Sequence, residues 1–246
     1  PGSGVLVQDQ LGIDTVGALD VRNQCSGFIY GLSVADQFIR TGMYKTILVI
    51  GSEIQSNIMN KSSEGRSLAV IFGDGAGAVV VQRAEEEGRG ILSTHLHSEG
   101  KHAEQLIVKE PSTRHKDQIL ERLIKEQHGN DIYPYMDGKY VFKHAVLRFV
   151  EVINEALDAN GYETSDIDML IPHQANLRIS QYVQKKLKLS DEKIWNNIQR
   201  YGNTTAASIP IALSEAHQAG KINRNDLVCL ASFGSGFTWA AAMLRW

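Results

Sequence analysis

The stretch Val21-Arg22-Asn23-Gln24-Cys25-Ser26-Gly27-Phe28 joins two kinds of apolar pattern. Before it, the mostly apolar segment Val16 to Val21 is typical of a strand. After it, apolar residues recur with helical spacing from Phe28 to Ile39, and Gly42 ends the pattern. The sequence therefore predicts a strand that leads directly into a helix, which is the repeating unit of α/β proteins.

Cys25 stands at the start of this predicted helix. The free N–H groups and the positive dipole end of a helix stabilise a thiolate, and cysteines in such places titrate at about 3.5 to 7.5. The alternative is a small buried hydrophobic residue, which a lone cysteine more often is. Two distant segments favour the reactive interpretation.

The first of these segments is Ile171-Pro172-His173-Gln174-Ala175-Asn176, which follows a short apolar run. The second is Arg200-Tyr201-Gly202-Asn203-Thr204-Thr205-Ala206-Ala207-Ser208, which opens another helix. A single histidine is often structural, and an asparagine before a helix is often a cap. Cys25, His173 and Asn203 each stand at a junction where α/β proteins place reacting groups, and only a fold brings them together. Taken together, the three residues indicate a catalytic site.

The remaining apolar patterns predict an internally repeated α/β chain. In each half, a strand, a reactive junction and a helix precede a glycine-rich turn between two strands, as expected of two fused copies of one unit. The predicted strands are 48–53, 68–72, 76–82, 91–97, 169–172, 227–233 and 238–244, and the predicted helices include 1–11, 113–128 and 139–158.

Bulk properties exclude several classes of protein. With 246 residues and 43% hydrophobic residues, the chain can bury a substantial core. No apolar run is long enough for a transmembrane helix, and the N-terminal residues lack the pattern of a signal peptide. The net charge of −3 and the lack of a basic stripe argue against a nucleic-acid-binding protein. Only Cys25 and Cys229 occur, so we expect no disulfide framework and a reducing cytoplasmic location, with Cys229 in the core.

Three further motifs could indicate dinucleotide binding, a metal site and a serine nucleophile, but the sequence around each one argues against that function. The run Gly73-x-Gly75-x-Gly77 precedes a strand rather than a helix, so tight backbone packing is preferred over dinucleotide binding. His95 and His97 share one face of a strand, but no cluster of further ligands accompanies them, so no metal site is expected. Ser235 lacks the Gly-x-Ser-x-Gly context of a nucleophile.

The three reactive segments, with Gly73-Asp74-Gly75-Ala76-Gly77-Ala78 and Phe233-Gly234-Ser235-Gly236-Phe237-Thr238-Trp239, resemble the β-ketoacyl-acyl-carrier-protein synthase III family over essentially the whole chain. This resemblance implies the thiolase fold, in which duplicated βαβαβ halves form αβαβα layers. It places an N-terminal half at 1–100, a connecting rim insertion at 101–136 and a C-terminal half at 137–246. Family members carry strands before the segment that begins this chain, so we expect the N-terminal part of the first half to be absent from this sequence.

The resemblance also implies a reaction. Cys25 takes an acyl group from a starter acyl-CoA, expected to be acetyl-CoA, and the acyl-Cys condenses decarboxylatively with malonyl-acyl carrier protein to initiate type II fatty-acid synthesis. His173 and Asn203 would donate hydrogen bonds to the enolate, and the backbone amides of Cys25 and Ser235 would form the oxyanion hole. No cofactor and no metal are expected, because acyl-CoA is a substrate.

The same resemblance implies that the protein is a homodimer. Further site residues are also assigned. The acyl and pantetheine pocket is assigned to Phe72, Gly138, Phe142 and Phe233. Binding of CoA and of the acidic carrier protein is assigned to Arg66, Asn176, Arg178, Lys185 and Lys186. The basic cluster of Lys185, Lys186 and Lys188 with Arg178 on one predicted helix is equally compatible with an ordinary solvated face. The charged segment 109–131 is expected to add a helix at the rim of the site.

Alternatives stay open at this point. A related enzyme of secondary metabolism would use the same three residues, and the polar residues Arg22, Asn23 and Gln24 would alter its starter preference. A degradative thiolase needs a second reactive cysteine, for which Cys229 is poorly placed within its predicted strand. A catalytically inactive homologue that acts as a binding subunit is disfavoured by the intact reactive residues.

Overall fold

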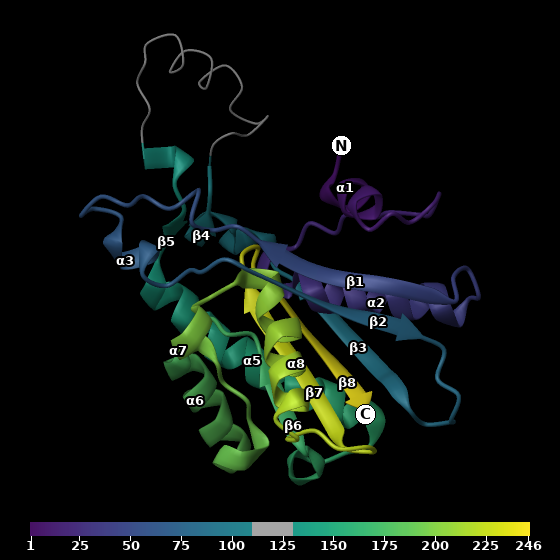
Figure 1. Ribbon diagram of the computed structural model, residues 1–246. Coiled ribbons are helices and arrows are strands. Elements are labelled where there is room, and N and C mark those ends of the chain that lie inside the picture. The colour runs from purple at the N-terminus through teal and green to yellow at the C-terminus, as the bar shows by residue number, and fades with distance from the viewer. Residues whose placement is uncertain (110–129) are drawn as a thin grey trace.

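The computed structural model describes residues 1–109 and 130–246 (Figure 1). The helix predicted at 113–128 lies outside the described residues. The helices are α1 (Ser3–Gln10), α2 (Gly27–Arg40), α3 (Arg66–Ala69), α5 (Gly138–Asn160), α6 (Leu177–Leu187), α7 (Ile198–Tyr201) and α8 (Ser208–Gln218). The strands are β1 (Thr46–Glu53), β2 (Gly75–Gln82), β3 (Gly90–Ser98), β4 (Leu106–Ile107), β5 (Tyr135–Met136), β6 (Met169–Pro172), β7 (Leu227–Gly234) and β8 (Thr238–Arg245).

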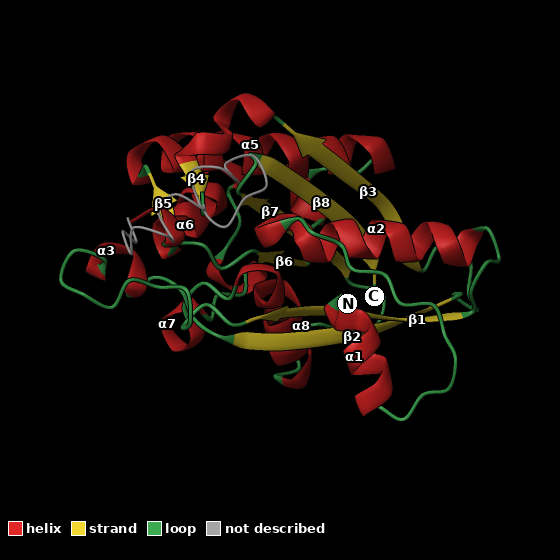
Figure 2. Ribbon diagram, turned by 90° about the horizontal axis from the view of Figure 1, so that it is seen from above, coloured by secondary structure: helices red, strands yellow, loops and turns green. Residues whose placement is uncertain are grey.

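The strands form two principal sheets with helical layers around them. β1 and β2 pair antiparallel, and a second sheet has the strand order β3-β8-β7-β6, in which only β6 and β7 are parallel. α2 lies between the two sheets, and α5 covers the far face of the four-stranded sheet (Figure 2). The result is the layered α/β arrangement that the sequence predicts.

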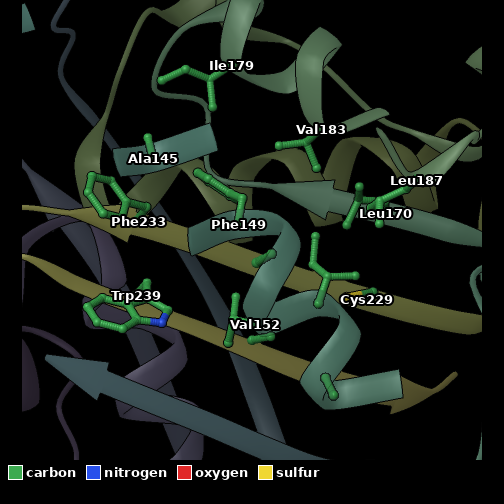
Figure 3. Close-up of a cluster of buried hydrophobic side chains, with 14 of the residues drawn as sticks. Ala145, Phe149, Val152, Leu170, Ile179, Val183, Leu187, Cys229, Phe233 and Trp239 are labelled. Atoms are coloured by element: carbon green, nitrogen blue, oxygen red, sulfur yellow. The ribbon is translucent and has the colours of Figure 1, made fainter. Parts of the chain in front are cut away.

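The four-stranded sheet is apolar on both faces because helices cover both. Along β7, Cys229 and Phe233 face α5 and α6, whereas Val228 and Leu230 face α2 and α8. Figure 3 shows the α5 side, where Phe149 packs among side chains of α6 and β7. Cys229 has no exposed surface, which confirms its predicted place in the core.

Two predicted strands are wrong. Residues 16–21 form no strand, and their side chains are exposed because no neighbouring strand in the described part of the chain pairs with them. Residues 68–72 begin within helix α3 instead. The residues Leu68, Ile71 and Phe72 all line one cavity, and their spacing of three and four residues is that of a helical turn.

The glycine-rich turn after α3 packs tightly, as predicted. A Cβ at Gly77 would lie 2.9 Å from the backbone nitrogen of Ile211 in α8, so only glycine permits this approach of β2 to the helix. The strand expected after the turn is β2.

The sheets cross the boundary expected between the two halves. β3 lies within the segment 1–100, yet it pairs along its length with β8 in the four-stranded sheet. Among the described residues, no helix combines the length and the apolar character needed to cross a bilayer.

Candidate active site

Cys25, His173 and Asn203 line a single cavity of about 640 Å³. Each stands just outside a regular element: Cys25 before α2, His173 after β6 and Asn203 between α7 and α8. The fold thus brings together three side chains that are up to 178 positions apart in the sequence, as the motif analysis predicts.

Cys25 occupies a short 3₁₀ turn, Gln24–Ser26, immediately before α2. The turn begins with Gln24 at φ 25, a backbone conformation that is unfavourable for a residue with a side chain. The cysteine is 5% exposed, and the backbone N–H groups of Ser235 and of Cys25 itself act on its sulfur and lower its pKa. These are the two amides that the family resemblance assigns to an oxyanion hole.

Burial raises the pKa of the Cys25 thiol to about 12, and the carboxylate of Glu53 acts in the same direction. The N–H groups of Ser235 and Cys25 lower it, but by less. The expectation of a lowered thiol pKa is therefore wrong for this structure, because the loss of solvation and the charge of Glu53 outweigh the stabilisation by the amides of Ser235 and Cys25. The thiol is protonated at neutral pH.

His173 continues the line of β6 into the site. Its backbone N–H donates to the carbonyl of Ala231 at 2.8 Å, which extends the parallel pairing with β7 by one residue. Nδ1 lies 2.6 Å from Oγ of Ser208, and Nε2 is buried with no hydrogen-bond partner in the described part of the chain. Burial lowers the pKa of the imidazole to about 3, so the ring is neutral.

Asn203 is held on both sides of its backbone. Its N–H donates to the carbonyl of Ile71 at 2.8 Å, and its carbonyl accepts from Gly73 at 3.0 Å. Its side-chain Oδ1 accepts from the backbone N–H of Thr205 at 2.9 Å. Because the oxygen is engaged there, the amide nitrogen is the end that remains free to donate within the cavity.

The other residues assigned to the site fall into two groups. Phe72, Gly138, Phe142, Phe233 and Asn176 also line the cavity. Arg66, Arg178, Lys185 and Lys186 do not line it; they are exposed, Arg66 on α3 and the other three on α6.

Ser235 contributes its backbone rather than its side chain. Its hydroxyl donates to the carbonyl of Leu106 at 2.6 Å, so it is engaged away from the cysteine. Beside it, the ring of Phe233 packs against that of Phe237 with centroids 4.8 Å apart. The arrangement suits an amide donor and offers no serine nucleophile.

Two residues at the site have no role in the sequence-based predictions. Glu53 is hydrogen-bonded by Thr205, Ala206 and Gln55, and its charge faces Cys25. Ser208 lies against His173. Ser208 ends the Gly-Asn-Thr motif, which is the only signal of its importance in the sequence.

His95 and His97 have a structural explanation. His95 Nδ1 lies 3.1 Å from one carboxylate oxygen of Glu155, and His97 Nε2 lies 2.6 Å from the other. Within residues 1–109 and 130–246, no three His, Cys, Asp or Glu side chains gather as a metal site would require.

Comparison with known families gives the same assignment over most of the chain. Residues 19–100 match the family 3-oxoacyl-[acyl-carrier-protein (ACP)] synthase III, and residues 157–246 match its C-terminal family. The whole chain is 46% identical to a β-ketoacyl-[acyl-carrier-protein] synthase III from Rhodospirillum centenum and covers 72% of it. The chain belongs to the β-ketoacyl-acyl-carrier-protein synthase III family. Members of this family are condensing acyltransferases.

Solved structures of this family share the fold. The 3-oxoacyl-[acyl-carrier-protein] synthase III of Aquifex aeolicus is 42% identical, with a TM-score of 0.88, and the chain covers 72% of that structure. The enzyme from Thermus thermophilus is 38% identical, with a TM-score of 0.90 and 73% coverage. In each comparison the whole of this chain is matched, so the thiolase-like fold predicted from the sequence is confirmed.

Proposed function

We propose that this chain performs the initiating condensation of fatty-acid synthesis by a decarboxylative Claisen reaction through an acyl-Cys25 intermediate. One observation carries this proposal: the thiol of Cys25 shares a cavity with His173, whose Nε2 has no hydrogen-bond partner in the described residues, and with Asn203, whose Oδ1 is engaged by Thr205 so that Nδ2 is the end left to donate. A nucleophile beside two unused donors suits a reaction that first forms a thioester and then an enolate.

In the first stage, Cys25 Sγ attacks the carbonyl carbon of an acyl-CoA. The new C–S bond replaces the bond to CoA, and the thiol proton leaves with the CoA sulfur. The amides of Cys25 and Ser235, which act on Sγ, stabilise the tetrahedral oxyanion. Such a donor lowers the barrier by about 3 to 4 kcal/mol in related acyl transfers.

In the second stage, malonyl-acyl carrier protein loses CO₂ and its thioester oxygen becomes negative. The neutral His173 and the free amide of Asn203 donate hydrogen bonds to this oxygen. The enolate carbon bonds to the acyl carbon, the C–S bond to Cys25 breaks, and the departing thiolate takes up a proton from solvent. The products are a β-ketoacyl-acyl carrier protein and CO₂, and no cofactor takes part.

The exposed basic face of α6 is the proposed docking surface for the acidic carrier protein. Arg178 and Lys185 are seven residues apart and share one helical face. Lys186 extends the surface, and Asn176 at the start of α6 connects it with the cavity. Such a surface increases the rate of encounter by electrostatic attraction. Arg66, exposed on α3 near the cavity, is the proposed contact for the CoA nucleotide.

We also propose that two copies associate. The segment between α1 and Cys25 exposes a series of apolar side chains, including Val16 at 50% and Leu19 at 64%. Exposed apolar surface of this kind favours association. Light scattering of the wild type and of Leu19→Asp tests this proposal, and a monomeric wild type at all concentrations would contradict it.

The central test is covalent trapping. The protein is incubated with a panel of straight and branched acyl-CoAs, and intact mass with peptide mapping locates the adduct. We expect an acyl group on Cys25, with acetyl as the preferred starter, and the same adduct in Cys229→Ala. The absence of any adduct from a folded protein would refute the proposed first stage.

The second stage has its own test. We expect His173→Ala and Asn203→Ala to retain Cys25 acylation and to lose decarboxylation of malonyl-acyl carrier protein by about 100-fold or more, as on removal of one oxyanion donor. Equal loss of both stages would contradict the roles given to these residues.

A further inference from the structure

Ser208 makes the only hydrogen bond of the His173 ring within the described residues. Its Oγ lies 2.6 Å from Nδ1, and both residues are 2% exposed. Ser208 is the first residue of α8, a helix of 11 residues whose next turns pack into the core between the sheets. The hydroxyl therefore approaches the ring from a fixed position.

The direction of this hydrogen bond follows from the partners within reach of the Ser208 hydroxyl. The backbone N–H of Gln174 reaches the same Oγ at 3.4 Å, and an amide N–H can only donate. The oxygen can accept from Gln174 with one of its two lone pairs, and Nδ1 is the only acceptor within hydrogen-bond distance of the hydroxyl proton among the described residues. Nδ1 is then the acceptor, and the proton of the neutral ring resides on Nε2.

We propose that Ser208 is a positioning residue that fixes His173 as the Nε2–H tautomer. The consequence for catalysis rests on the function proposed above. Nε2 is the ring nitrogen without a partner, and the cavity that it shares with Cys25 and Asn203 is where the enolate oxygen forms. In the other tautomer, Nε2 carries a lone pair, which repels a developing negative charge rather than stabilising it.

Burial alone does not choose between the two tautomers. It lowers the pKa of His173 to about 3 and so keeps the ring neutral, but both neutral forms carry the same net charge. In serine proteases, a variant that holds the catalytic histidine in the wrong tautomer loses about 10⁴-fold in kcat. This value is an upper limit for the loss expected when His173 takes the wrong tautomer. Loss of one orienting hydroxyl, which leaves the ring in place, is expected to cost less.

The direct test is nitrogen NMR of protein labelled with ¹⁵N-histidine, without substrates, at pH 7. The chain has 8 histidines, and the signals lost in His173→Asn identify the ring. We expect the wild type to show a protonated Nε2 and an unprotonated Nδ1. Ser208→Ala should show a mixture of tautomers or Nδ1–H, and Ser208→Thr, which keeps a hydroxyl, should restore the wild-type pattern. A wild-type Nδ1–H ring, or an unchanged pattern in Ser208→Ala, would overturn the proposal.

The kinetic test uses the two half-reactions separately. We expect Ser208→Ala to lower decarboxylation by about 10- to 100-fold and to change Cys25 acylation by less than about 2-fold, with rescue by Ser208→Thr. Ser180→Ala is the matched control, because Ser180 is also a buried serine but donates to Asn196. Equal losses in Ser208→Ala and Ser180→Ala would show a merely structural effect.

The NMR and kinetic experiments together distinguish failure of the role given to Ser208 from failure of the proposed function on which that role rests. The tautomer is measured without any substrate. If the wild type is the Nε2–H form and Ser208→Ala is not, while malonyl thioesters do not react, the proposed function fails and the role of Ser208 in setting the tautomer stands. If decarboxylation is active in the wild type but independent of Ser208, the inference fails alone.

Discussion

A Cβ built on Gly234 would lie 2.5 Å from the Cβ of Cys25 and 2.9 Å from its sulfur. Real Cβ atoms do not approach other atoms so closely, so the end of β7 and the nucleophile fit each other only because residue 234 is glycine. The same approach brings the next amide, that of Ser235, to the sulfur. Glycine at this position is therefore a requirement of the proposed oxyanion hole.

Gly234→Ala should displace either Cys25 or the Ser235 amide. We expect a fall in acylation of Cys25 of at least about 10-fold and a loss of about 1 to 3 kcal/mol in the free energy of unfolding, as for overpacked cores. Gly100→Ala is the control, because a Cβ there meets nothing within 4 Å. Acylation kinetics and urea denaturation measure the two effects, and normal acylation in Gly234→Ala would contradict this account.

The raised pKa of Cys25 predicts an unusual alkylation profile. Only the thiolate reacts, and the folded thiol titrates at about 12 rather than at its ordinary value of 9.0. The rate of iodoacetamide labelling at Cys25 should therefore rise about 10-fold for each pH unit between 8 and 10, without a plateau near 9. Peptide mapping separates Cys25 from Cys229, and a small free thiol provides the reference. A plateau below pH 9 would show that the amides outweigh burial.

His173 should make the protein sensitive to acid. Its folded pKa is lowered from 6.5 to about 3, so in this range the unfolded chain binds a proton that the folded chain does not. The resulting stability is fully present above pH 6.5 and is lost as the pH falls toward 3, by at most about 1.4 kcal/mol per pH unit. Urea denaturation from pH 7 to 4 should show a steeper loss for the wild type than for His173→Asn. Parallel curves would contradict the prediction.

Glu215 on α8 organises the segment that leads to Asn203. Its carboxylate accepts from Asn197 Nδ2 at 2.7 Å and from the Tyr201 hydroxyl at 2.5 Å, and it pairs with Arg200. These contacts hold the pKa of Glu215 at about 2, despite the opposing effect of burial. The buried Asn197 loses its partner in Glu215→Ala, so we expect a loss of about 1 to 3 kcal/mol in the free energy of unfolding.

A surface ion pair provides the comparison for Glu215. Glu151 pairs with Arg148 at 2.6 Å, and its side chain is 54% exposed. Glu151→Ala should cost less than about 1 kcal/mol, the usual range for exposed pairs. Guanidinium or urea denaturation measures the free energy of unfolding of both variants. Equal losses in Glu215→Ala and Glu151→Ala would mean that Glu215 has no special role in placing Asn203.

The sequence predicted the meeting of Cys25, His173 and Asn203 because each residue stands in a recognisable motif at the end of a regular element. Strands buried on both faces, such as β7, were also predictable from their continuous apolar character. The segment 16–21 has a similar character but forms no strand, since a strand needs a partner and the described chain supplies none. The apolar run 68–72 was mistaken because short runs fit either a strand or a helical turn.

The electrostatics of the site were not predictable in the same way. The position of Cys25 before α2 suggested a lowered pKa, but the balance depends on how completely β7 and the charge of Glu53 enclose the thiol. Ser208 was missed for a related reason. It is 35 residues from His173 in the sequence, and only the packing of α8 places its hydroxyl against the ring.

The sulfur of Cys25 receives an amide that is 210 positions later in the chain. During translation, a ribosome completes the Cys25 turn and α2 long before residue 235 exists, so the growing polypeptide contains Cys25 without the amide of Ser235. Under the proposed function, acyl-CoA therefore meets a Cys25 that lacks the Ser235 amide until the last two strands, β7 and β8, have joined the sheet. The proposed acylation of Cys25 would then report that synthesis and folding have both reached the C-terminal strands.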